Sequence, residues 1–231
     1  MNTKKIVISM IAGLCLSLPA FAEITLQEEN EIQTRIDSVG VNLLNKNKID
    51  KRIIFVYDKN EKRKFLAEDK TLTKRQVVVY DDIYKYIQTD DELAAMLARE
   101  ISIAVKSFKG EFGGAMGSIE VAAAPKKAEI FADKRAVDYL VKAGYNPLAL
   151  IVFINKTCPQ RRVDFISSHN LTSKRLARLY EYITFKYPEY LDNNQYIDNE
   201  YYQNFLLSSV NNRKLLNEKI QSGSKKELKY E

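Results

Sequence analysis

Apolar residues recur with the period of an α-helix along most of the chain. Between residues 27 and 45 they are spaced by four, three and four positions, at Ile32, Ile36, Val39 and Leu43. This spacing places them on one face of an amphipathic helix whose other face is charged. Further helices are predicted at 90–108, 125–142, 147–156, from about 172, and at 199–220.

Several of these helices have boundary signals in the sequence. Thr89 or Asp90 can cap the helix at 90–108, and acidic residues fill its first turn, where the helix dipole favours them. The helix at 125–142 begins with a proline and stops at Ala143-Gly144. Between these two helices, the stretch KGEFGGAMGS contains four glycines, which predicts a loop.

Two short runs have the composition of β-strands. RIIFVYD at 52–58 and RQVVVYD at 75–81 are rich in β-branched and aromatic residues, and a charged segment separates them. We expect them to be neighbouring strands of a small sheet. The predicted class is therefore α+β, mostly helical, with one domain at 23–220 and a polar tail at 221–231 that we expect to be frayed.

The first 22 residues have the pattern of a secretory signal peptide. A basic start, MNTKK, precedes a short apolar run that ends at Ala20-Phe21-Ala22, an A-x-A cleavage site. We expect cleavage after Ala22 and a periplasmic or secreted protein with no transmembrane segment thereafter. A retained membrane anchor is the alternative reading of the apolar run. A lipoprotein anchor at Cys15 is disfavoured, because Leu14 stands where a small residue is expected.

Charge, cysteine and histidine counts narrow the chemistry further. Cleavage removes two lysines, leaving 36 − 2 = 34 basic residues against 30 acidic ones. This small net positive charge does not identify a ligand, and nucleic acid is not expected as a partner. Cys158 is then the one cysteine left, so the domain has no internal disulfide. His169 is the one histidine, which excludes any mechanism that needs two imidazoles on one chain.

The helix at 90–108 has the frame of a metal-binding helix. Zinc peptidases use His-Glu-x-x-His because residues i and i+4 share one helix face, and the glutamate activates the zinc-bound water as general base. In this chain the corresponding letters are Arg99-Glu100-Ile101-Ser102-Ile103. The central glutamate is present, and both histidines are replaced.

Three blocks together resemble one peptidase family. DDELAAMLAREI, AEIFADKRAVDYLVKAGYNPLAL and SSHNLTSKRLARL, in this order, are similar to the signature blocks of the HtpX-like zinc metallopeptidases, which include prenyl-protein proteases. The blocks cover about 80 residues, starting at residue 90. The resemblance implies a zincin-like metallopeptidase domain, for which zinc is the expected cofactor in the family.

The departures from the family concentrate at the metal. The resemblance implies that Arg99 stands at the first zinc histidine, Ile103 at the second, and Phe131 at the third ligand, a glutamate. Isoleucine and phenylalanine have no donor atoms, and a guanidinium repels a dication. We therefore expect no zinc, no other cofactor, and no proteolysis by the family mechanism.

Other positions of the family's site are retained. The resemblance places Glu100 at the general base, Asp133 at an acid that supports the metal ligands, His169 in the third block and Arg175 six residues after it. The proline that follows the histidine in the family is Asn170 here. Each retained residue also has an ordinary structural interpretation, as a paired acid, a hydrogen-bonded histidine or a salt-bridge arginine.

The buried acids need a cationic partner if the metal is lost. We predict that Arg99 turns into the former metal site and pairs with Asp133, and also with Glu100 or Glu129. Three functions stay open: an inactive peptidase-like domain that binds a polypeptide in the old cleft, a working metalloendopeptidase or other hydrolase, and a structural or interaction domain with a closed cleft. A pocket around Glu100 and His169 favours the first two, and a filled one favours the third.

Overall fold

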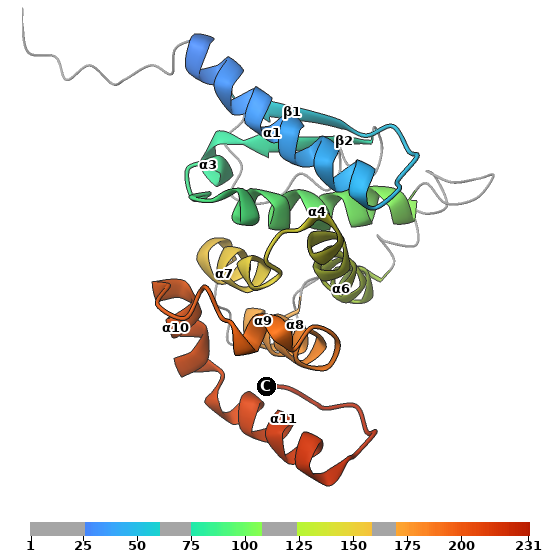
Figure 1. Cartoon of the computed structure of the whole chain (residues 1–231), viewed down its shortest axis with the longest axis vertical. Helices are drawn as coiled ribbons and strands as arrows, with labels where there is room; N and C mark the ends of the chain where they lie inside the picture. Colours follow the sequence, from blue (N-terminus) through green and yellow to red (C-terminus); the bar gives the residue numbers. More distant parts are fainter. Residues whose placement is uncertain (1–25, 61–74, 108–123, 159–169) are drawn as a thin grey trace, which may run out of the picture.

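A computed structural model describes residues 26–60, 75–107, 124–158 and 170–231 of the chain. The predicted signal peptide, the glycine-rich loop and His169 lie outside these residues. Within them the fold is mostly helical with a two-stranded parallel sheet, which confirms the α+β class. Figure 1 shows the sheet and α1 (Leu26–Lys46) at one end of the long axis and α11 (Val210–Ser222) at the other.

The sheet pairs β1 (Ile54–Asp58) with β2 (Gln76–Tyr80), as the two β-rich runs predict. Phe55, Val77 and Val79 face the main core, where α1 covers β1. α1 approaches closely because Gly40 has no side chain at the point where the Phe55 ring lies. α3 (Asp81–Tyr84) follows β2 directly.

The centre of the fold is a packed group of helices. α4 (Asp90–Ser107) lies between α1 on one side and the pair α6 (Pro125–Ala143) and α7 (Leu148–Thr157) on the other (Figure 1). All residues of α4 from Leu93 to Ala104 are buried. A helix that is buried on every side must satisfy any polar side chain it carries inside the protein.

The remaining helices build the other end of the molecule. They are α8 (Thr172–Lys186), α9 (Glu189–Asp192), α10 (Glu200–Ser208) and α11. α8 packs on both α6 and α7, and α10 packs on α7. α8 therefore brings the third sequence block against the second.

The structure confirms most predicted helix boundaries. The Thr89 hydroxyl accepts the backbone N–H of Glu92 at 3.2 Å, so Thr89 rather than Asp90 caps α4. Gly144 ends α6 in the left-handed conformation, at φ 83°.

Two predictions for the C-terminal part are wrong. The helix expected at 199–220 is two helices, because Ser209 leaves the helical conformation and the chain changes direction there (Figure 1). The tail expected to be frayed folds back, and Tyr230 in it is 4% exposed. The tail was expected to fray because its letters are polar, but one aromatic ring is enough to anchor it.

Candidate functional site

Arg99 and Glu100 are adjacent charged residues in the buried part of α4. They are 4% and 2% exposed, respectively. The Arg99 guanidinium donates from Nη1 to Glu100 Oε1 at 2.9 Å and from Nε to Asp133 Oδ1 at 3.3 Å. The predicted pairing of Arg99 with Asp133 and Glu100 is therefore confirmed. The guanidinium joins α4 to α6.

α6 carries two acids toward this position, one helical turn apart. Glu129 and Asp133 are residues i and i+4, so they share the face of α6 that meets α4 and α8. Both are buried, at 4% and 3% exposed. Residues with this spacing on a helix reach the same site, as two histidines do in a metal-binding helix.

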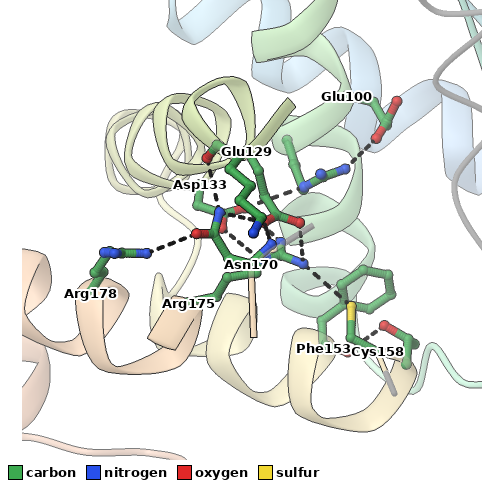
Figure 2. A network of polar contacts seen from close by, with 11 residues as sticks. Glu100, Glu129, Asp133, Phe153, Cys158, Asn170, Arg175 and Arg178 are labelled. Atoms are coloured by element: carbon green, nitrogen blue, oxygen red, sulfur yellow. Dashed lines mark hydrogen bonds and ion pairs between the residues drawn. The ribbon is translucent and has the colours of Figure 1, made fainter. Parts of the chain in front are cut away.

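α8 supplies the second guanidinium. Arg175 holds Asp133 with two bonds, from Nε to Oδ2 and from Nη2 to Oδ1, each 2.9 Å long. Its Nη1 lies 3.1 Å from Glu129 Oε1 and 3.6 Å from the sulfur of Cys158. Such a two-pronged arginine–carboxylate pair fixes geometry as well as charge. Figure 2 shows Arg175 at the centre of these contacts.

Asn170 donates two further hydrogen bonds to Glu129 (Figure 2). Its backbone N–H and its Nδ2 both donate to Glu129 Oε2, at 2.9 and 2.8 Å. Arg178 in turn donates to Asn170 Oδ1 at 3.2 Å. The resemblance places a proline at this position, and proline has neither of the two donors. Asn170 therefore gives the acid two hydrogen bonds that a proline could not donate.

We call Arg99, Glu100, Glu129, Asp133 and Arg175 the buried ionic cluster. It holds two cations and three anions, all nine-tenths or more buried. Burial is the largest single influence on the pKa of Arg175 and lowers it, but the charge of Asp133, the interaction with Cys158 and the hydrogen bond to Asp133 together outweigh burial and raise the pKa above its ordinary value. The guanidinium is therefore a fixed positive charge, and the cluster ties α4, α6 and α8 together.

Ile103 and Phe131, the two apolar residues at expected ligand positions, lie in different surroundings. Ile103 is 4% exposed and lies one turn after Arg99 on α4. Phe131 is half-buried and lies against cations, with Lys106 Nζ 5.0 Å and Arg135 Cζ 5.8 Å from its ring centre. The structure thus places Glu129, rather than Phe131, beside Asp133 and Arg175. The spacing of Glu129 and Asp133 on one helix is the sequence signal for this assignment.

The cluster does not fit a zinc ion. A zinc site requires three neutral or anionic donor groups. Arg99 is a cation, and the Ile103 side chain has no donor atom. Among the residues that the structure describes, no group of three or more histidine, cysteine, aspartate and glutamate side chains is arranged to hold a metal ion.

Comparison of the chain with models of protein families, with curated proteins and with solved structures finds no match. In the described part of the chain, no helix combines the length and the apolar character needed to cross a membrane.

Proposed function

We propose that this chain is a peptidase-like domain that has lost zinc catalysis and acts by binding a polypeptide, in the periplasm or outside the cell. The observation that supports it most is the Arg99 guanidinium between Glu100 and Asp133. It puts a permanent cation at the position where the resemblance expects a zinc ligand. The proposal includes a zincin-like fold that has lost its metal.

The state of Glu100 supports the loss of catalysis. A general base must reach a water or substrate proton and must be free to take it. Glu100 is 2% exposed, and its carboxylate accepts a hydrogen bond from a cation on the neighbouring residue. Such a carboxylate is engaged in a buried structural pair, and this arrangement counts against a working metalloendopeptidase.

The same burial favours a second candidate. A filled centre is the feature expected of an interaction domain whose cleft has closed, and the contacts among Arg99, Glu100, Asp133 and Arg175 fill it. In that case the polypeptide binds elsewhere on the surface, or the domain has a purely structural role.

Zinc content tests the loss of the metal. The purified chain is equilibrated with zinc, desalted and measured by elemental mass spectrometry, and we expect less than a tenth of an equivalent. Stoichiometric zinc in the wild-type chain would overturn the proposal.

Two variants sharpen this test. Arg99→His with Ile103→His restores the i, i+4 imidazoles, and Glu129 supplies a carboxylate from α6. We expect this double variant to bind zinc, because a dication then replaces the guanidinium between the same acids. Adding Phe131→Glu should change little, since Phe131 lies against Lys106 and Arg135. The matched control is Arg99→Met with Ile103→Met, which has no imidazole.

Binding and cleavage are then followed in one sample. Fluorescein-labelled, unfolded casein is mixed with the wild-type chain, and anisotropy and fragment size are recorded together. The proposal expects raised anisotropy and no fragments. Casein fragments that form only with zinc would support a working metalloendopeptidase. Unchanged anisotropy would favour an interaction domain with a closed cleft.

A further inference from the structure

The segment 224–231 lies between α8 and α11 (Figure 1), and we call the place that it occupies the groove. α11 ends at Gly223, which adopts φ 62°, and the N–H of Ser224 bonds back to the carbonyl of Lys219 at 3.2 Å. This left-handed cap reverses the chain. Figure 1 shows the segment turning at the end of α11 and running back to the space between α11 and α8.

Asn212 of α11 recognises the main chain of this segment. Its Nδ2 donates to the main-chain oxygen of Glu231 at 3.0 Å, and its Oδ1 accepts the N–H of the same residue at 3.2 Å. Asn212 is 5% exposed, so both bonds lie at a buried amide. A side-chain amide that pairs with the N–H and C=O of one residue holds an extended peptide as a neighbouring strand would, without reading its side chains.

Tyr230 is the one buried side chain of this segment. It is 4% exposed, and burial together with the nearby charge of Glu181 on α8 raises the pKa of its hydroxyl. Glu181 also forms an ion pair with Lys219 of α11 at 2.7 Å, which joins the two helices. The ring is therefore buried near Glu181 of α8, next to the residue that Asn212 of α11 binds.

The attachment is confined to these two features. Of the eight residues in 224–231, Tyr230 is the one that is buried, and Ser224 and Leu228 are half-buried. The other five are exposed. A segment with so few buried contacts opens at low free energy compared with global unfolding. The groove can therefore be vacated while the helices stay folded.

We propose that the groove between α8 and α11 is a peptide-docking site, occupied here by the chain's own 224–231 segment, which a tyrosine-bearing extended segment of a partner protein replaces. The preferred ligand has a tyrosine, and the main chain of the residue after it meets Asn212. Flanking positions are free, because the corresponding side chains of the segment are exposed. This site is separate from the buried ionic cluster and does not rest on the loss of zinc.

The test uses a fluorescein-labelled peptide of sequence SKKELKYE, which reproduces 224–231. Its binding is measured by anisotropy against the full wild-type chain and against Tyr230→Ala. We expect the variant to bind at least about ten-fold more tightly, because a tethered competitor at millimolar effective concentration no longer fills the groove. The peptide SKKELKAE should not bind, and Asn212→Ala combined with Tyr230→Ala should lose binding. The control Lys229→Ala changes an exposed residue and should behave as wild type.

The proposal would be overturned if the double variant bound the peptide as tightly as Tyr230→Ala does. It would also be overturned if the Tyr230→Ala chain, with an unchanged far-UV circular dichroism spectrum, did not bind the peptide. If Tyr230→Ala loses helix, a peptide with a photo-crosslinking phenylalanine in place of its tyrosine is used in excess on the wild-type chain. A cross-link to α8 or α11 supports the site, and a cross-link elsewhere, or none, counts against it. A wild-type dimer that the peptide dissociates would identify a second copy of the chain as the occupant instead.

Discussion

Replacing Arg99 by methionine tests the central feature of the fold. Methionine keeps much of the length and apolar volume of arginine, so the change removes mainly the charge and the hydrogen bonds. The variant loses the bonds to Glu100 Oε1 and Asp133 Oδ1, all between side chains that are 4% exposed or less. Asp133 keeps its two bonds from Arg175, so the penalty falls mostly on Glu100.

The expected cost follows from these contacts. Hydrogen bonds to charged groups contribute about 1.5–3 kcal/mol each, so two of them amount to about 3–6 kcal/mol. Breaking a buried ion pair by removing one partner costs about 3–5 kcal/mol, which agrees. We expect the free energy of unfolding of Arg99→Met to fall by about 3–5 kcal/mol.

Urea unfolding followed by far-UV circular dichroism measures this difference. With a slope of about 2 kcal/mol per molar urea, the midpoint should fall by roughly 2 M. The control Arg52→Met removes an exposed arginine and should change stability by less than about 0.5 kcal/mol. Adding Glu100→Gln to Arg99→Met should recover more than about 1 kcal/mol, because the buried acid that lost its bond to Arg99 is then neutral.

A cost below about 1 kcal/mol for Arg99→Met would refute the reasoning. It would mean that Glu100 and Asp133 are satisfied without the guanidinium. The lack of any recovery in the double variant would show that the cost comes from packing rather than from charge.

Two further predictions concern the fold away from the cluster. A Cβ on Gly40 would lie 2.6 Å from Phe55 Cδ2 and Cζ, so Gly40→Ala should destabilise the protein by about 1–2 kcal/mol, even though alanine favours helix. Phe55→Leu should absorb the added methyl group, and additive losses in a urea double-mutant cycle would contradict the predicted clash. Burial raises the pKa of Tyr202 to about 12, and its side chain ionises by losing a proton. The neutral Tyr202 side chain should therefore contribute about 2–3 kcal/mol to the free energy of unfolding below pH 10, and this contribution should be lost as the pH rises to 12. In urea titrations, Tyr202→Phe should lose less stability than the wild-type chain over this pH range. Equal slopes for the two proteins would rule out this role for Tyr202.

The class of fold and most helix boundaries could be predicted from the sequence. Apolar spacing fixes the buried face of α1, and the Pro125 and Gly144 signals fix the ends of α6, because these are properties of a few consecutive residues. The Arg99–Asp133 pair was also predictable, since two charges on apolar helices must meet when both are buried.

Other features depend on which helix faces meet. Sequence blocks align residues by their letters, and this suggested Phe131 for the pocket. The helical period of α6 instead points Glu129 and Asp133 together at Arg175, a residue more than 40 positions away. The break at Ser209 and the burial of Tyr230 likewise have no local signal. They result from contacts between residues distant in the chain, whose burial is decided by tertiary packing.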